Sequence, residues 1–398
     1  HRDLHRLIRR QRQMCIRDSN DCGDVNVTLD PIGLFENWSY KREINISNAG
    51  PALTDYQVKV VLNSSNFDFS KIKSNCEDIR FANSAEDTEL SYWIEECNTA
   101  GEEAVIWAKA PAIPESSSTS IWMYYGNDDA SSTSNGNETF IFFDDFSLNT
   151  IGTVWTVEKG SPTISGGLLL MDPGDGVYNG VQRQYVNQRW KGILSNTNNN
   201  AWQGWNAYGG LNGAGVGGVV RSNYGTTSCY DIGYGGAECN ERIDVGYPDP
   251  SDNNWHTFEI LWNNDDKYHY LYIDDILRAS ATGCQKTHFK VIEYMLWGGS
   301  GQDKVDWTLI RKSTPQEPVL TIGPEEPAGQ PRAAGRSREV SRGKTADRGV
   351  DPCQTQREGP DRAEDQRTQD RVEPVGGEDA GPGRTSPRGP ANRPCRSL

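Results

Sequence analysis

Residues 78–127 read DIRFANSAEDTELSYWIEECNTAGEEAVIWAKAPAIPESSSTSIWMYYGN, and this stretch decides the fold class. In DIRFAN, the apolar residues Ile79 and Phe81 alternate with polar ones, and the same alternation recurs around Tyr92 in ELSYWIEE and around Met123 in TSIWMYYGN. A period of two residues is typical of a half-buried strand. Polar or Pro- and Gly-bearing turns separate the segments, so that strands begin about every 12 residues, the spacing of a β-sandwich.

Two further strands precede this stretch. The segments KREINIS and DYQVKVVLN place Ile44 with Ile46, and Val58 with Val60, on inward faces. We therefore expect a six-stranded sandwich over residues 35–139, closed by the polar connection NDDASSTSNGNET.

A second domain is expected over residues 140–323. It offers eleven short strand candidates and no convincing amphipathic helix, which favours two packed antiparallel sheets. The candidates are FIFFDDF, WTVEKG, TISGGLLLM, VQRQYV, GVGGVVRS, CYDIGYG, RIDVGY, WHTFEILW, YHYLYIDD, HFKVIEYMLW and KVDWTLIRK. The sequence thus predicts an all-β protein with two β-sandwich domains.

The two ends differ from both domains. Residues 324–398 contain no Phe, Trp or Tyr, and such a segment cannot bury enough apolar surface to offset its ordering entropy. We expect this tail to be disordered, and either a reading-frame artefact or a true linker. Residues 1–19 contain RRQRQMCIRDS, which resembles translated sequencing-adaptor DNA, so we expect a disordered artefact there; a basic nucleic-acid arm is the alternative. Residues 20–34 are interpreted as a linker.

Several motifs resemble known families. DIRF, YWIEEC, VIWAKAPAIP, IWMYYGN and FIFFDDF are similar to the DUF2341 family, a β domain of unassigned function on extracellular proteins, over about residues 35–146. From Phe143 onward, FDDFS, WHTFEILW, YLYIDD and VDWTLIRK resemble the concanavalin A-like lectin/glucanase superfamily, of the LamG or jelly-roll type. The second resemblance implies that residues 140–323 form a jelly roll.

Charge and hydropathy exclude two classes of partner. The chain has 40 basic and 55 acidic residues, and residues 20–323 hold 20 basic and 40 acidic ones. Such an excess repels phosphate backbones, so no nucleic-acid partner is expected. No apolar run approaches the roughly 18 residues of a membrane span, so no transmembrane segment is expected in the sequence given.

Nine cysteines raise the question of disulfides. Three lie in the end segments, at Cys15, Cys353 and Cys395. If DIRF and YWIEE pair antiparallel, Cys76 and Cys97 meet at one end of the hairpin, and Cys229 and Cys239 bracket the Gly-rich excursion YDIGYGGAE. We expect both pairs to be oxidised, with reduced buried thiols as the alternative.

The compartment follows from the same argument. The chain carries five N-x-[ST] sequons, at Asn26, Asn37, Asn45, Asn63 and Asn137. Together with the cysteines they favour an extracellular or cell-surface location.

Catalytic signatures are missing from the sequence. Glucanases of the second family place carboxylates in an E-x-D-x-E pattern on one strand, whereas WHTFEILW offers a single Glu259, which we expect to face solvent. There is no G-x-S-x-G, and GAGVGG at residues 213–218 lacks the helix that a dinucleotide site requires. We expect no enzyme activity, unless two carboxylates converge in space without a sequence pattern.

A calcium site is a further expectation. Asp145 lies in the first strand candidate of the second domain, which in a jelly roll lies beside the last strand, where Asp306 stands. Carboxylates from adjacent strand ends suit Ca²⁺, and the relatives of this fold often carry a structural calcium there. The alternative is a solvated acidic patch.

Aromatic residues supply the binding hypothesis. Eight of the 12 Trp residues lie in strand patterns and are predicted to be core, namely Trp38, Trp93, Trp107, Trp122, Trp155, Trp255, Trp262 and Trp307. Four residues stand instead in a stretch rich in Asn and Gly, interpreted as a loop; they are Trp202, Trp205, Asn206 and Tyr208. Flat aromatic faces stack on sugar rings, and Asn side chains bond hydroxyls. The alternative is that these rings fold back as a lid.

These observations predict a non-catalytic extracellular or cell-surface protein whose jelly roll binds a glycan or cell-surface polysaccharide. A purely structural or adhesive module is the first alternative. A glycoside hydrolase is the second.

Overall fold

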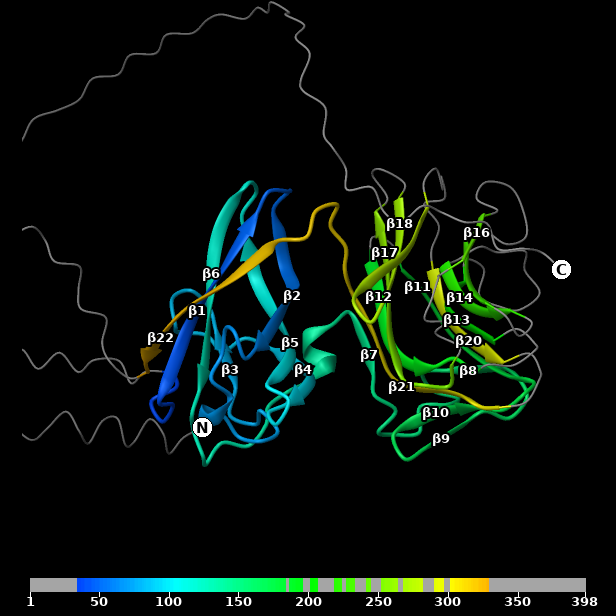
Figure 1. The fold of residues 1–398 in the computed structure, drawn as a ribbon, viewed down its shortest axis with the longest axis horizontal. Helices are drawn as coiled ribbons and strands as arrows, with labels where there is room; N and C mark the ends of the chain where they lie inside the picture. Colours follow the sequence, from blue (N-terminus) through cyan, green and yellow to red (C-terminus); the bar gives the residue numbers. More distant parts are fainter. Residues whose placement is uncertain are drawn as a thin grey trace, which may run out of the picture. The chain divides into compact units, whose positions relative to one another are not determined.

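The structure is a computed structural model. It describes residues 34–183, 186–195, 201–206, 218–223, 227–232, 241–244, 252–263, 268–281, 290–296 and 301–328. These residues form two compact units (Figure 1). The first unit comprises the chain up to Asp144 together with Leu309–Pro331, and the second comprises Asp145–Thr308. Nearly all regular structure in the described residues is β-strand, as the sequence predicts.

The first unit contains two antiparallel sheets. The larger has the order β22-β1-β6-β3 and the smaller the order β2-β5-β4. The strands are β1 (Tyr40–Asn48), β2 (Leu53–Asn63), β3 (Arg80–Ala82), β4 (Tyr92–Asn98), β5 (Glu103–Ile113), β6 (Ser117–Tyr125) and β22 (Val319–Pro327). A short 3-10 helix (Phe69–Lys71) lies between β2 and β3.

The core of the first unit lies between these sheets. Ile44 and Ile46 of β1 are fully buried, and they belong to one apolar cluster with Val58 and Val60 of β2 and Met123 of β6. The predicted inward faces of these strands are therefore confirmed. Branched and aromatic side chains at alternate positions supply the apolar burial that holds the two sheets together.

The smaller sheet is also covered on its other face. Trp93 of β4 packs edge-on against Phe140 and Phe143, with ring centroids 5.7 and 5.0 Å apart. Phe140 caps the single-turn helix α2 (Gly136–Thr139), and Phe143 lies in the strand that follows, β7 (Phe142–Asp144). Residues 140–144 therefore belong to the first unit, and the predicted boundary at residue 140 is corrected to 144.

The chain returns to the first unit after the second. Strand β22 pairs with β1 from Ser47 opposite Val319 to Tyr40 opposite Pro327. Its Leu320 and Ile322 pack against the core cluster. The predicted boundary at residue 323 therefore falls inside β22, and the first residues of the predicted tail form its end. Two prolines and a weak apolar pattern conceal this strand in the sequence, and both features suit an edge position.

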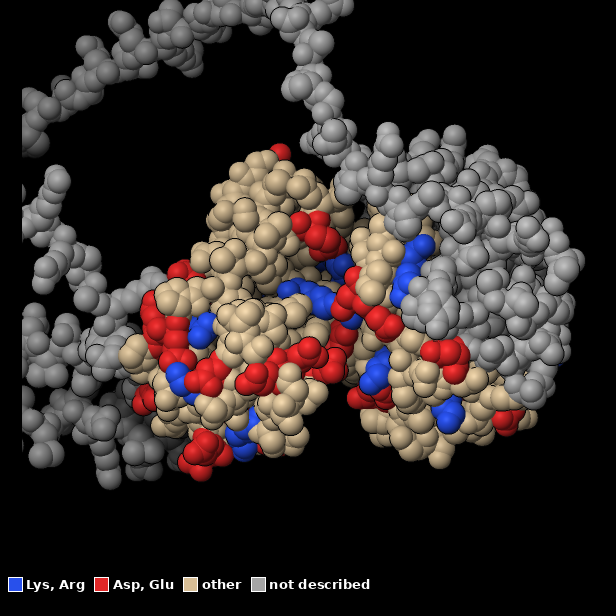
Figure 2. Space-filling model, viewed as in Figure 1, with Lys and Arg blue, Asp and Glu red and all other residues tan. Residues whose placement is uncertain are grey.

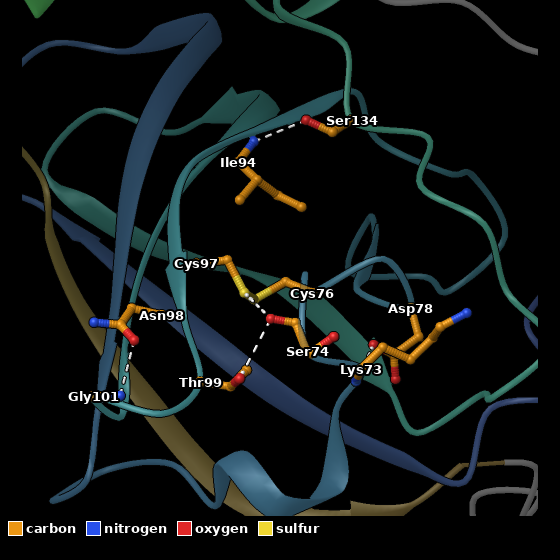
Figure 3. The surroundings of a disulfide bond; sticks show 10 residues. All are labelled: Lys73, Ser74, Cys76, Asp78, Ile94, Cys97, Asn98, Thr99, Gly101 and Ser134. Carbon is orange, nitrogen blue, oxygen red and sulfur yellow. Dashed lines mark hydrogen bonds between the residues drawn. A yellow bond between two sulfur atoms is a disulfide. The ribbon is translucent and has the colours of Figure 1, made fainter.

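A disulfide joins Cys76 to Cys97, as predicted, with the two Cα atoms 6.1 Å apart (Figure 3). The expected hairpin is wrong, however, because β3 pairs with β6 and β4 pairs with β5. Cys76 leads into β3 of the larger sheet and Cys97 lies in β4 of the smaller one. The crosslink therefore connects the two sheets of the sandwich.

The second unit is a sandwich of two larger antiparallel sheets. One has the order β19-β18-β17-β12-β21-β10-β9, with β7 also pairing with β21, and the other the order β16-β15-β14-β13-β20-β11-β8. The strands of the first of these sheets are β9 (Thr163–Ser165), β10 (Leu168–Met171), β12 (Val186–Ile193), β17 (His256–Asn263), β18 (Tyr268–Ile273), β19 (Ile276–Ala281) and β21 (Asp303–Lys312). Those of the second are β8 (Thr156–Lys159), β11 (Asp175–Arg183), β13 (Ala201–Asn206), β14 (Gly218–Asn223), β15 (Thr227–Ile232), β16 (Glu241–Asp244) and β20 (Lys290–Leu296).

Chain crossings between these sheets give the unit its jelly-roll character. The chain changes sheet repeatedly, for example from β10 to β11, from β12 to β13 and from β20 to β21. Between the sheets Trp190 stacks on Phe258 at 5.1 Å, and Tyr294 lies 5.6 Å from Trp155. The sequence predicts most of these strands and misses β12, β13 and β19.

Two surface properties bear on partners. Within the described residues, no helix has the length and apolar character needed to cross a bilayer. On the face of the described residues that Figure 2 shows, acidic side chains are interspersed with basic ones, and no extended basic patch appears.

Candidate binding site

The residues predicted to bind sugar lie on a strand. Residues 201–206 form β13, which pairs with β20 on one side and with β14 on the other. Trp202 stands opposite Met295 and Trp205 opposite Ile292. The predicted loop is therefore wrong for these residues, because pairing to two neighbours overrides the low strand propensity of the surrounding Asn and Gly.

A buried glutamine anchors this strand to the opposite sheet. The Gln203 side-chain Oε1 accepts a hydrogen bond of 2.9 Å from the Trp190 indole, and its Nε2 donates to Asp303 and to the Ile193 carbonyl, each at 3.1 Å. Gln203 has no exposed surface. Because breaking a buried polar contact costs more than an exposed one, this network fixes the position of β13.

Two neighbours complete the network. Asp303 accepts hydrogen bonds from the Ser195 amide at 2.8 Å and from its hydroxyl at 2.5 Å. Burial raises the pKa of Asp303 to about 6, although these hydrogen bonds favour its charged form. At Gly192, a Cβ atom would stand 2.8 Å from the Gln203 Oε1, so that only glycine permits this close approach of β12.

The side chains of Trp202, Trp205 and Asn206 lie outside the described residues, and so does the whole of Tyr208. Their role in binding stays a prediction. Cys229 lies in β15, opposite Asp244, whereas Cys239 is outside the described residues. The second disulfide also stays a prediction.

The two predicted calcium ligands have partners of their own. Asp145 is exposed and accepts a hydrogen bond from the Ser147 amide at 3.1 Å. Asp306 lies 3.4 Å from the ammonium of Lys191. No group of three or more His, Cys, Asp or Glu side chains suited to a metal occurs in the part of the chain that the structure describes. Calcium binding stays a prediction.

The sequence did not predict two clusters of charged residues that lie near β17. Arg189 Nη1 contacts Glu259 at 3.0 Å and Asp275 at 2.8 Å. Glu259 is only 7% exposed, so the expectation that it faces solvent is wrong. The reason is Arg189, which compensates its charge across the β12–β17 pair.

The second cluster surrounds His256, the first residue of β17. Its Nδ1 lies 2.7 Å from Asp274 and its Nε2 lies 3.1 Å from Asp252. The hydrogen bond to Asp274, first, and then that to Asp252 raise the pKa of His256. Asp274 and Asp275 both have positive φ, 52° and 59°, and form the two-residue turn between β18 and β19, a position at which Asp is tolerated better than most residues.

The adjacent Trp255 differs from its prediction. It is 40% exposed, whereas the sequence pattern predicts a core position. Trp255 precedes the first residue of β17, so the alternation of that strand does not bury it. The preceding D-x-N turn, residues 252–254, was the signal in the sequence that could have shown this.

Comparisons with known proteins bear on both units. Residues 75–158 match the family model described as a domain of unknown function, DUF2341. This confirms the predicted resemblance over that part of the chain. No curated protein matches the chain.

The solved structures to which the chain is similar include several glucanases. A prokaryotic β-1,3-1,4-glucanase (lichenase) derived from a mouse hindgut metagenome is 12% identical and covers 43% of this chain and 98% of its own, with a TM-score of 0.37. An endo-β-1,3-glucanase from Pyrococcus furiosus is 15% identical and covers 44% of this chain and 94% of its own, with a TM-score of 0.34. A Bacillus licheniformis β-glucanase is 13% identical, and the match covers 44% of this chain and 97% of the glucanase, with a TM-score of 0.32. At these values the similarity carries no functional argument.

Proposed function

We propose that the second unit binds carbohydrate without cleaving it, through the sheet that contains β13. The observation that supports this most directly is the placement of β13 as an interior strand held by Gln203. A binding strand that is already fixed loses little conformational entropy when a ligand arrives.

Strand alternation suggests which tryptophan carries the binding. Gln203 contacts Trp190 and Asp303 of the opposite sheet, so its position faces the interior of the sandwich. Successive strand residues occupy opposite faces. Alternation therefore assigns position 202 to the outer face, and position 205 to the same face as Gln203. Trp202 becomes the first candidate for stacking on a sugar ring.

The proposal that the unit does not cleave its ligand rests on how its carboxylates are held. A retaining glycosidase needs two carboxyl groups about 5–5.5 Å apart, one of them able to act as an acid. Glu259 and Asp275 do converge, but both are engaged by the same nitrogen of Arg189, at 3.0 and 2.8 Å. Asp252 and Asp274 occupy both ring nitrogens of His256, which leaves no nitrogen to exchange a proton with a substrate.

We also propose an extracellular or cell-surface location. The Cys76–Cys97 disulfide supports it, because such crosslinks persist in oxidising compartments. Asn37, Asn45 and Asn137, which head three of the sequons, are exposed on the first unit.

A glycan array with the whole chain tests the proposed binding, and Trp202→Ala is compared with Trp205→Ala on the glycans that bind. We expect Trp202→Ala to weaken binding by about 1–3 kcal/mol, or roughly 5- to 150-fold, without changing the unfolding midpoint. We expect Trp205→Ala to lower the unfolding midpoint. If no glycan binds, the second unit is a structural or adhesive module. If glycan is bound and then shortened, the hydrolase alternative replaces the proposal.

A further inference from the structure

An exposed tryptophan stands at the start of β17, on the sheet that does not contain β13. Trp255 is 40% exposed, whereas Trp155 and Trp190 are buried, with exposed fractions of only 1% and 0%. A large apolar side chain in water on a soluble domain is a sign of a binding surface when its surroundings are also arranged for binding.

The backbone on both sides of Trp255 is fixed by carboxylates. Asp252 accepts hydrogen bonds from the amide and from the side-chain amide of Asn254, each at 2.8 Å. Asp274 accepts from the Thr257 amide at 3.0 Å, and His256 is held between Asp252 and Asp274. The residues before and after the indole are thus ordered without a ligand, which lowers the entropic cost of binding.

Polar groups suited to hydroxyls stand beside the ring. Lys191 Nζ lies 5.8 Å from the centroid of the Trp255 ring and 3.4 Å from the Asp306 carboxylate. The side chains of Lys191 and Asp306 are 40% and 35% exposed. An accessible donor therefore lies over one face of the indole, with an accessible acceptor next to that donor, and the other face is left for stacking.

We propose that Trp255, Lys191 and Asp306 form a second saccharide-binding surface, the Trp255 platform, for neutral pyranosides with equatorial hydroxyls. Such sugars carry their axial C–H groups on flat apolar faces, which stack on an indole. Their hydroxyls both donate and accept hydrogen bonds, so they can bind the ammonium and the carboxylate together.

Charge around the platform is already compensated. Three carboxylates, of Asp252, Asp274 and Asp306, face three basic groups, of Lys191, His256 and Arg278, the last of which helps to lower the pKa of Asp274. A neutral sugar leaves these pairs intact, whereas an added uronate or sulfate would have to compete with Asp306 for Lys191 and would lose affinity.

The platform shares its ligand class with the proposed function but none of its residues. The test therefore uses the full chain carrying Trp202→Ala, so that binding at β13 is weakened. Cellohexaose, whose hydroxyls are equatorial, is titrated into this protein by calorimetry, and a β-1,4-linked glucuronate hexamer serves as the charged counterpart. Further variants add Trp255→Ala, Trp255→Phe or, as a matched control, Leu148→Ala, which removes an apolar side chain that is 74% exposed in the same unit.

We expect cellohexaose to bind the Trp202→Ala protein. Adding Trp255→Ala should weaken this binding at least about tenfold, Trp255→Phe should keep most of it, and Leu148→Ala should leave it unchanged. The glucuronate hexamer should bind more weakly than cellohexaose. Unfolding midpoints of all variants establish that the fold is kept.

Two results would overturn the platform. One is the absence of cellohexaose binding to the Trp202→Ala protein, which leaves the proposed function at β13 standing. The other is binding that survives Trp255→Ala, which places the sugar elsewhere. Conversely, Trp255→Ala could abolish cellohexaose binding while Trp202→Ala leaves it equal to that of the unsubstituted chain. This result would support the platform and count against the site at β13.

Discussion

Asp303 shows how burial sets the contribution of a single residue. It has no exposed surface, and three hydrogen bonds from Ser195 and Gln203 hold its carboxylate in place. Burial nevertheless raises its pKa from 3.8 to about 6, because desolvation of the charge outweighs these bonds. The charged form at neutral pH is therefore less favourable in the folded than in the unfolded chain.

This pKa predicts how stability depends on pH. A raised folded pKa gives a contribution to stability that is fully present below pH 4 and is lost as pH rises through about 6. We expect the free energy of unfolding of the second unit to fall over this range by up to about 3 kcal/mol from this group. Asp303→Asn should remove this part of the pH dependence of the free energy of unfolding. Urea unfolding of both proteins at pH 4.5 and pH 7 measures that free energy. If it changed with pH by the same amount in both proteins, the assignment to Asp303 would be contradicted.

Glu259 illustrates that the sequence around a strand residue does not show whether its side chain is buried or which residue it contacts. Its strand pattern indicates a solvent-facing carboxylate, and yet it is buried against Arg189, 70 positions earlier. Trp255 is the converse, an aromatic in an apolar run that the end of the strand leaves exposed. Both errors have one cause, because the partners of a strand residue come from neighbouring strands that the local pattern does not identify.

Among the elements, β22 most changes the interpretation of the first unit. Glu325 binds Lys71 at 2.6 Å and the Tyr125 hydroxyl at 2.8 Å, so the strand is held by side chains as well as by its ladder with β1. Because Lys71 and Glu325 are partly exposed, most of the stabilisation comes from the apolar side chains of the strand.

Ile322 and Thr321 offer a matched test of this element. Ile322 stands opposite Ile44 and packs on the core, whereas its neighbour Thr321 is exposed. Ile322→Asn should destabilise the first unit by about 2–3 kcal/mol, since it removes apolar burial and places an amide there. Thr321→Asn should stay within about 0.5 kcal/mol. Thermal unfolding measures both; equal midpoints would show that β22 contributes little.

Local periodicity was enough to predict β1 to β6 of the first sandwich, though not β22, because Ile44, Val58 and Met123 each face one core. It failed for β13, where Trp202 and Trp205 stand among residues of low strand propensity. It also failed for the pairing of Cys76 and Cys97, which was predicted correctly from an incorrect hairpin. The two cysteines meet because the sheets face each other, and strand patterns do not specify which sheet a strand joins.

At the scale of the whole molecule, two all-β units were predictable from composition and strand spacing. Their boundaries were not, because the chain leaves the first unit at Asp144 and returns to it at Leu309. A sequence read in order suggests consecutive domains. The return strand carries too few apolar residues for its pairing with β1 to be recognised before the structure is known.

Metal dependence is a further property of the whole second unit. The calcium prediction requires its unfolding midpoint to rise with free Ca²⁺, by a stabilisation of about 2.7 kcal/mol at one hundred times Kd, and to fall in chelator. To bind the ion, Asp306 must exchange its contact with Lys191 for one with the metal. Scanning calorimetry with and without chelator makes the measurement. Identical curves would remove the site and leave Asp306 to the Trp255 platform.

The pairing of Tyr40 with Pro327 also determines how the first unit responds to mechanical force. The chain enters at β1 and leaves at β22 from the same end of one antiparallel ladder, where the Ala328 amide donates to the Ser39 carbonyl at 3.0 Å. Tension applied through these two points loads the backbone pairs one after another, as in a zipper, and not all at once, as in shear. We therefore expect this pair of strands to open at a lower force than strands of the same length that are pulled in shear.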